Sequence, residues 1–318
     1  MPAGKPQRMA APHRILCSGI AVIDQVFRVS EFPLGDGKIA AHDYVSVVGG
    51  GAANAAVAIA RLGGAARYAG PLGGGPGEDP IGDRIIAALE AEGIDCSGCV
   101  RVDGASSAVS AVLVDAAGGR AIIHHRAGVL RKATPADPER LVAEIDSVLA
   151  DDHCPQFAAP ICAAARRRGL PVVLDIEKKV LPADLLFAMA THRIFSRAGL
   201  CATLDLDNTI STDALAAALA HMAGNEDAFY AVTDGAGAIP WCAGHACGKV
   251  PVFPVEAVDT LAAGDVFHGA FALALLEGGD GVEALRFAAA TAAIKCTRFG
   301  GGAAAPTREE VDCLLAAP

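Results

Sequence analysis

The chain lacks an uninterrupted apolar run long enough to span a bilayer. Its most apolar stretch, Val266–Leu276, is too short for a transmembrane helix and contains His268. The N-terminal segment is basic, but no hydrophobic stretch follows it, so it does not form a secretory signal. We therefore expect a cytoplasmic protein with no membrane partner.

Basic residues are also in short supply. The 318 residues include 26 lysines and arginines against 36 aspartates and glutamates, which gives a formal net charge of −10. A nucleic-acid-binding protein normally carries a basic stripe, so this balance argues against a nucleic-acid partner. At the same time, 53% of the residues are hydrophobic, which is too many for a disordered chain and enough for a large buried core.

Cysteine is sparse for a chain of this length, with ten residues. Cys96 and Cys99 have C-x-x-C spacing, but no second pair follows at the distance of a zinc ribbon. Cys242, His245 and Cys247 lie in a glycine-rich segment typical of a hairpin, and they offer too few ligands for a structural zinc site. We expect reduced, structural thiols at both places, and the sequence assigns no metal ligand.

Strand-like apolar runs alternate with helical segments along most of the chain. Ile15–Gly19, Val172–Asp175 and Tyr230–Thr233 are short apolar runs of the kind that form buried strands. Helical patterns lie between such runs, including the alanine-rich segment 52–63. This alternation is typical of a mostly parallel sheet with helices on both faces.

Two segments depart from this alternation, at about residues 26–48 and 107–125. Both place turn residues between short β-type runs, which is typical of β-hairpins. We expect these segments to form a small accessory sheet. No internal repeat or low-complexity linker divides the chain, so we predict a single α/β domain over residues 1–318.

The strongest signal for chemistry is the segment Asp259–Asp265, D-T-L-A-A-G-D, which precedes an apolar helix. Small residues let the backbone approach a ligand closely, and the amides that open a helix point toward an anion. Asp265, a carboxylate at that helix end, is suited to act as general base for a hydroxyl that attacks phosphorus. It is equally suited to cap its helix, and the spacing alone leaves both interpretations open. We expect Pro254–Val258 to form the strand that leads into this motif.

The sequence D-T-L-A-A-G-D-V-F-H-G-A-F resembles the C-terminal signature of the ribokinase-like (PfkB) carbohydrate kinases, usually D-T-x-G-A-G-D. Three further segments resemble the family's motifs in the same order, namely residues 19–24, 49–54 and 292–303. The resemblance implies a three-layer α/β/α ribokinase-like fold with a mostly parallel central sheet. It also implies that the accessory sheet is a β lid over the substrate.

The resemblance assigns roles to individual residues. It implies that Asp265 is the catalytic base, and that an anion hole is formed by the amides of Ala262, Ala263 and Gly264. The residues implied to hold sugar hydroxyls are Asp24, Gly50 and Asn54. Each has a structural explanation when it is taken singly, such as a turn for the glycine. The shared order of the motifs favours the functional interpretation.

The nucleotide side follows the family pattern less closely. The segment 233–238, T-D-G-A-G-A, follows a buried strand as the family's ATP loop does, which implies that the phosphates of ATP lie near Thr233, Gly235 and Gly237. The family's N-x-x-E motif, which helps to position magnesium, is replaced by S-R-A-G at 196–199. Mg²⁺ is still expected from the chemistry of phosphoryl transfer. Its ligands and any monovalent-cation requirement stay open, and Arg197 is interpreted as a phosphate contact or as a surface charge.

The lid carries cationic candidates for the acceptor site: Lys38, His124, His125 and Arg126. Such a set is suited to attract an anionic substituent on a sugar, whereas a solvated sheet edge explains it equally simply. Because neighbouring strand residues face opposite sides, only one of His124 and His125 can point inward.

Some details are especially similar to the sulfofructose kinase branch of the family, namely D-V-F-H-G-A, K-C-T-R and G-K-I-A. That branch holds its sulfonate with a Lys, an Asn and an Arg. Lys38 matches the Lys, and His124 and His153 stand at the other two positions. A sulfonated sugar, another hexose, a ketose and a sugar phosphate all stay open as acceptors.

The function expected from the sequence is ATP-dependent phosphorylation of a primary hydroxyl on a small sugar-like acceptor. Several members of the family dimerise through the lid, so we expect a homodimer that pairs its β lids. Two alternatives are a nucleoside kinase of the same fold and a catalytically impaired protein that binds a sugar or a nucleotide.

Overall fold

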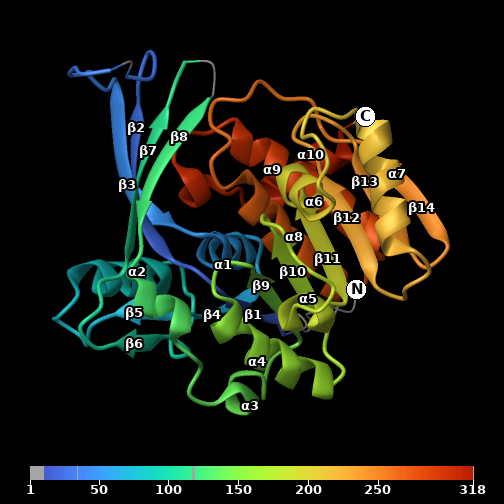
Figure 1. The fold of residues 1–318 in the computed structure, drawn as a ribbon, viewed down its shortest axis with the longest axis horizontal. Helices are drawn as coiled ribbons and strands as arrows, with labels where there is room; N and C mark the ends of the chain where they lie inside the picture. The colour runs from blue at the N-terminus through green and yellow to red at the C-terminus, as the bar shows by residue number, and fades with distance from the viewer. Residues whose placement is uncertain (1–10, 34, 117–118, 318) are drawn as a thin grey trace, which may run out of the picture.

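The computed structural model describes residues 11–33, 35–116 and 119–317. Its centre is an eight-stranded sheet with the strand order β14-β13-β12-β11-β10-β9-β1-β4 (Figure 1). These strands are β1 (Arg14–Ser18), β4 (Ala65–Ala69), β9 (Ser147–Asp151), β10 (Val172–Ile176), β11 (His192–Ser196), β12 (Phe229–Thr233), β13 (Ile239–Ala243) and β14 (Ala246–Val250). From β12 to β4 all neighbours are parallel, while β13 and β14 continue the sheet as an antiparallel hairpin.

Helices cover both faces of this sheet. They are α1 (Gly51–Arg61), α2 (Pro80–Ala91), α3 (Pro138–Leu141), α4 (Pro155–Arg167), α5 (Leu185–Met189), α6 (Arg197–Thr203), α7 (Thr212–Ala223), α8 (Ala263–Leu276), α9 (Gly281–Cys296) and α10 (Arg308–Ala316), with 3₁₀ turns η1 (Gly128–Lys132) and η2 (Gly301–Ala304). Along β10, Val173 packs into the core with α1, α8 and α9, whereas Val172 and Leu174 pack into the core with α4 to α7. This alternation buries both faces of the sheet, and the expected three-layer α/β/α fold is confirmed.

A second sheet has four strands in the order β3-β2-β7-β8. Its strands are β2 (Val22–Arg28), β3 (Asp43–Gly49), β7 (Ala108–Val114) and β8 (Arg120–His125), and a separate short pair is formed by β5 (Pro71–Gly73) and β6 (Val100–Val102). Figure 1 shows the four strands, in blue and green, projecting beyond the three layers. On the inner face of this sheet, which we call the lid, Val26 and Val112 pack against Leu261 near the start of α8. The lid is thereby anchored beside the D-T-L-A-A-G-D motif.

Two sequence expectations are wrong. No strand forms at Pro254–Val258, because this described segment runs without a ladder partner from the end of β14 toward α8. Cys242 and Cys247 are also not reduced thiols, since they face each other across the β13–β14 hairpin and form a disulfide. Cys96 and Cys99 are free thiols as expected. No helix among the described residues has the length and apolar character needed to cross a membrane.

Candidate active site

The three residues of the predicted anion hole lie at the start of α8. Ala262 has a left-handed backbone with φ of 61°, and this turn directs the chain from the motif into the helix. The N–H of Ala263 lies 3.3 Å from the carbonyl oxygen of Thr260 and closes the turn. Within the described residues, the amides of Ala262 and Gly264 have no hydrogen-bond partner. The structure therefore leaves two of the three predicted amides ready for an anion, next to the positive end of the α8 dipole.

Asp265 lies in the first turn of α8 and faces α1. The Asn54 side chain donates a hydrogen bond of 2.6 Å from Nδ2 to Oδ2 of Asp265. Burial and the nearby carboxylate of Glu177 raise the pKa of Asp265 to about 7, while the Asn54 hydrogen bond lowers it. Asp265 does not cap α8, whose N-cap is Ala262 without a side-chain hydrogen bond. A carboxylate with a pKa near neutrality is suited to accept a proton.

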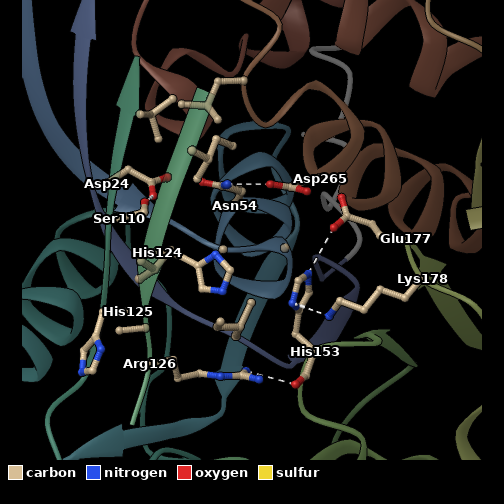
Figure 2. Close-up of a pocket in the computed structure, with 18 of the residues that line it drawn as sticks. Asp24, Asn54, Ser110, His124, His125, Arg126, His153, Glu177, Lys178 and Asp265 are labelled. Atoms are coloured by element: carbon tan, nitrogen blue, oxygen red, sulfur yellow. Dashed lines mark hydrogen bonds and ion pairs between the residues drawn. The ribbon is translucent and has the colours of Figure 1, made fainter. Parts of the chain in front are cut away.

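Asp265 borders a cavity of about 440 Å³ between the lid and the α/β layers, which we call the lid cavity (Figure 2). The residues predicted to bind sugar that line it are Asp24, Gly50, Asn54, His124 and Arg126. Figure 2 shows Asp24, Asn54 and Asp265 at one end and Arg126 at the other. The structure thus brings together side chains from β2, α1, β8 and α8 that are far apart in the sequence.

Asp24 is held from the neighbouring strand. It is paired in register with Ser110 of β7, whose hydroxyl donates a hydrogen bond to Oδ1 of Asp24. Burial raises the pKa of Asp24, and the Ser110 hydrogen bond counteracts this effect. A Cβ on Gly49 would come within 1.8 Å of Oδ2 of Asp24, and Gly50 has φ of 96° with no space toward the carbonyl of Ile20. The two glycines are therefore needed where α1 begins beside this carboxylate.

The opposite end of the lid cavity is cationic. The positively charged or imidazole side chains that line it are His124, Arg126, Arg131, His153 and Lys178. Nη1 of Arg126 donates to the carbonyl oxygen of His153 at 3.0 Å, while Nζ of Lys178 lies 2.8 Å from Nδ1 of His153. Among the described residues, no carboxylate forms an ion pair with Arg126 or Arg131.

His153 joins this cationic end to the carboxylates. Its Nε2 lies 3.1 Å from an oxygen of Glu177. Burial works against a charge on the ring, but Glu177 and Asp151 outweigh it and raise the pKa of His153. The ring therefore stands between the two charged ends of the cavity.

Two predicted lid residues occupy other positions. Lys38 is exposed in the loop between β2 and β3, and it is not among the described residues that line the lid cavity. Both His124 and His125 line the cavity, and Figure 2 shows the His124 ring near its centre and the His125 ring at its edge. The alternation of strand side chains explains why the two histidines separate.

Sequence reasoning missed several side chains of this site. Ser110, Arg131, Glu177 and Lys178 line the lid cavity, and none belongs to the motifs. Asp151 was also missed: its carboxylate accepts hydrogen bonds from the amides of Ile20 (2.8 Å), Ala52 (3.0 Å) and His153 (2.9 Å). Acidic residues at the ends of buried strands were the available signal, because Asp151 is the last residue of β9 and Glu177 directly follows β10. The carboxyl ends of parallel strands converge at one edge of the sheet.

Three carboxylates at this edge could hold a metal ion. Oxygens of Asp175, Glu177 and Asp265 all lie within 4.8 Å of one another. Burial, and next the carboxylates of Glu177 and Asp265, raise the pKa of Asp175 well above its usual range. Hard oxygen donors that repel each other in this way fit Mg²⁺, whose charge would relieve the repulsion.

The other side of the α8 N-terminus opens into a second cavity of about 610 Å³, which we call the apolar cavity. Thr233 and Gly235, two of the residues predicted to lie near the phosphates of ATP, line it, whereas Gly237 lies outside its lining and donates to the carbonyl oxygen of Asp234 in a turn. Most of its wall was not predicted and consists of small or apolar residues: Val252, Phe253, Val255, Phe267, Ala289, Ala292 and Ala293.

Arg197 is not a solvated surface charge, and its contact with phosphate stays a prediction. Its guanidinium forms an ion pair with Asp234 and donates to the carbonyl oxygen of Ile210 at 2.7 Å. Asp234 also accepts a hydrogen bond of 2.6 Å from Thr212. Arg197 therefore fixes the loop that follows β12 at the edge of the apolar cavity.

Comparisons with known proteins agree with this arrangement. Residues 12–308 match the family model described as pfkB family carbohydrate kinase. The chain is 29% identical to the ribokinase of Bacillus subtilis, over 93% of this chain and 97% of that protein. It is also 29% identical to the ATP-dependent ribose-1-phosphate kinase of Halopiger xanaduensis, over 95% and 98% of the two chains.

A solved structure shares the fold over nearly the full length. A provisionally assigned ribokinase from Agrobacterium tumefaciens superposes with a TM-score of 0.87 at 36% identity, covering 96% of this chain and 97% of that one. The matched region spans the lid, the D-T-L-A-A-G-D motif and both cavities. The chain therefore belongs to the pfkB family of carbohydrate kinases.

Proposed function

We propose that this chain transfers the γ-phosphoryl group of ATP to a primary hydroxyl of a sugar-like acceptor. The observation that carries the proposal is the position of the α8 N-terminus between the two cavities. Asp265 lines the lid cavity, while Ala263 and Gly264 line the apolar cavity. An acceptor on one side and ATP on the other would meet at the same helix end.

In this mechanism Asp265 accepts the proton of the acceptor hydroxyl as that hydroxyl attacks the γ-phosphorus, the bond to the bridging oxygen breaks and ADP leaves. Asn54 orients the carboxylate through its 2.6 Å hydrogen bond. The amides of Ala262 and Gly264 stabilise the negative charge of the transferring group. Asp24, held by Ser110, accepts hydrogen bonds from other acceptor hydroxyls. The lid excludes water, which would otherwise accept the phosphoryl group.

The positions proposed for the nucleotide and the metal are based on the chemistry of the residues that line the apolar cavity and of the nearby carboxylates. The apolar cavity is suited to a flat aromatic base, with Thr233 and Gly235 on the phosphate side. Asp175 and Glu177 would hold Mg²⁺, which neutralises phosphate charge when it is bound. Glu177 stands two residues after Asp175 and supplies a carboxylate although the N-x-x-E motif is absent.

The cationic end of the lid cavity favours an acceptor that carries an oxyanion. Arg126, Arg131 and Lys178 line that end, opposite Asp265. A carboxylate, sulfonate or phosphate group on the acceptor would supply the negative partner that the two arginines lack among the described residues. A sulfonated ketohexose, as in the sulfofructose kinase branch, is one such acceptor. The Halopiger relative is named for another, ribose 1-phosphate.

A substrate panel tests these proposals. ADP release would be measured with neutral pentoses and hexoses, their phosphate, sulfonate and carboxylate derivatives, and nucleosides. We expect release that depends on an anionic sugar, with much weaker turnover of the neutral counterpart. Preferred turnover of nucleosides would favour a nucleoside kinase, and the absence of release with every compound would favour the impaired binding protein.

A variant at the cationic end tests the oxyanion site directly, with the neutral acceptor as the matched control. Arg131→Gln keeps the size and polarity of the side chain but removes its charge. It should raise the KM of the anionic acceptor about tenfold or more, as expected for the loss of a charge-assisted contact, and leave the neutral counterpart unaffected. Equal effects on both acceptors would contradict an oxyanion site.

A further inference from the structure

A buried ion pair beneath the anion hole has no part in the proposed transfer step. Lys295 of α9 and Asp259 of the D-T-L-A-A-G-D motif are both 0% exposed. Nζ of Lys295 lies 2.8 Å from the main-chain oxygen of Asp259 and 3.4 Å from its Oδ2. Burying two charges costs free energy, and apolar side chains of similar volume would fill the same space without that cost. The presence of the pair therefore requires an explanation.

The carboxylate of Asp259 organises the backbone on two sides. Its Oδ1 accepts the amide of Leu261 at 2.8 Å, which sets the start of the turn containing Ala262. Its Oδ2 accepts the amides of Gly300 at 3.1 Å and Gly301 at 3.2 Å. One side chain thereby fixes the anion-hole turn against the loop that follows α9.

That loop also reaches the proposed catalytic base. Gly302 packs against Asn54 so closely that a Cβ at Gly302 would lie 2.0 Å from Oδ1 of Asn54. Asn54 in turn holds Asp265. The amides of Val258 and Asp259 donate to the carbonyl oxygen of Cys296 at 2.8 and 3.1 Å, next to Lys295. The anion hole, the base and the end of α9 are therefore linked through one buried charge.

We infer that Lys295 is a positioning residue, a built-in cation that holds Asp259 and, through it, the anion-hole amides in place. The inference rests on the proposed phosphoryl transfer. The ammonium neutralises Asp259 from within the chain, so this turn needs no free monovalent cation. Burial lowers the pKa of Lys295, and the Asp259 carboxylate counteracts that effect.

The test replaces Lys295 by methionine, an unbranched side chain that is one heavy atom shorter and carries no charge. Turnover would be measured with Mg²⁺ and with tetramethylammonium as the monovalent cation, then with added NH₄⁺ or K⁺. Wild-type turnover should be full and unaffected by either ion. The Lys295→Met variant should lose at least about tenfold in kcat, as expected for misplaced anion-hole donors, and retain affinity for a non-hydrolysable ATP analogue.

Cation rescue is the readout that a merely structural role would not produce. NH₄⁺ or K⁺ should restore kcat of Lys295→Met saturably, because the oxygens of Asp259 remain to bind an ion of that size. The melting temperature of this variant should rise with the same ions while that of the wild type stays constant. The melting temperature can be measured without turnover. It therefore tests the inference about Lys295 even if the proposed kinase activity is wrong.

Two further variants serve as controls, one for misfolding and one for a nonspecific effect of replacing a lysine. Lys295→Met combined with Asp259→Asn removes both charges, and should fold, keep a low kcat and show no response to cations. Lys249→Met removes a lysine from an exposed ion pair with Asp213 and should behave as wild type. A wild-type requirement for K⁺ or NH₄⁺, a folded Lys295→Met without cation response, or normal kcat in the double variant would each overturn the inference.

Discussion

The lid cavity and the apolar cavity meet at one helix end, yet they are built in opposite ways. The lid cavity takes its character from charged and polar side chains held on strands and helices, such as Asp24, Asn54 and Asp265. The apolar cavity is lined mainly by small and apolar residues, with Thr233 and Asp234 at its edge. The first arrangement specifies hydroxyls and charges, whereas the second offers shape and exposed backbone. Proton transfer is therefore expected to depend on one side of α8 and nucleotide affinity on the other.

The largest expected effect comes from Asp265→Asn, which keeps the size of the side chain but cannot accept a proton. Positioned acid–base groups contribute about 10²–10⁴-fold to rate, and we expect kcat to fall by that amount. Affinity for an ATP analogue and the melting temperature should change little. Near-normal turnover would leave the motif with a structural role only.

The next largest effect is expected for a variant of the acceptor site, which should change the KM of the acceptor without changing that of ATP. Asp24→Asn weakens hydrogen bonds from acceptor hydroxyls to a charged group, so the acceptor KM should rise about ten- to a hundredfold. The KM of ATP should not change, because Asp24 does not line the apolar cavity. Ser110→Ala, which removes only the support of Asp24, should have a smaller effect in the same direction. A large rise in the KM of ATP would contradict the division.

The reciprocal variant fills the apolar cavity. Ala293 is 8% exposed and lines this cavity, so Ala293→Phe should occupy space proposed for the nucleotide. Overpacking typically costs about 1–3 kcal/mol, and a loss of that size in ATP binding corresponds to a rise of about five- to 150-fold in the KM of ATP. The acceptor KM should be unaffected at saturating ATP. Titration calorimetry with an ATP analogue would check the affinity directly, and unchanged affinity would place the nucleotide elsewhere.

A smaller effect is expected in the pH profile of Asn54→Ala. The Asn54 hydrogen bond favours the charged form of Asp265, so its removal should raise the pKa of that carboxyl. A base acts only when it is deprotonated, so the acid limb of kcat/KM should move to higher pH. An unchanged limb would mean that Asn54 does not tune the base.

The smallest effect on catalysis concerns the homodimer, which we retain as a proposal. Ile123 is 74% exposed and Tyr44 is 51% exposed, and both lie on the lid. If two lids pair over these side chains, Ile123→Glu should shift the molar mass in light scattering from dimer to monomer, with little change in kcat. A wild-type monomer at high concentration would remove the proposal.

The fold and part of the lid cavity could be predicted from the sequence. The three-layer fold was predictable because buried parallel strands and helices leave distinct periodic patterns, as at Val172–Asp175. Asp265 and Asp24 could be predicted as site residues because both lie in segments that resemble the family's motifs in the same order. Ser110 and Arg131 were not, since only the pairing of β7 with β2 and the fold of η1 bring them to the lid cavity.

The apolar cavity was the harder side to predict. Alanines on α9, such as Ala289 and Ala293, look like any buried helix face until tertiary packing leaves a hollow beside them. The expected strand at Pro254–Val258 failed because no neighbouring strand offers it a ladder. The disulfide between Cys242 and Cys247 depends on their register across the hairpin, which the spacing alone did not reveal.

The proposed mechanism depends above all on the claim that Asp265 takes the proton. The most direct test is the pH dependence of single-turnover kcat/KM for the wild type and for Asp265→Asn, with the titration of the substrates common to both. We predict that the wild type loses rate as the pH falls through about 7, where the carboxyl becomes protonated, and that the slow variant lacks this limb. The same acid limb in the Asp265→Asn variant would assign it to another group and contradict the claim.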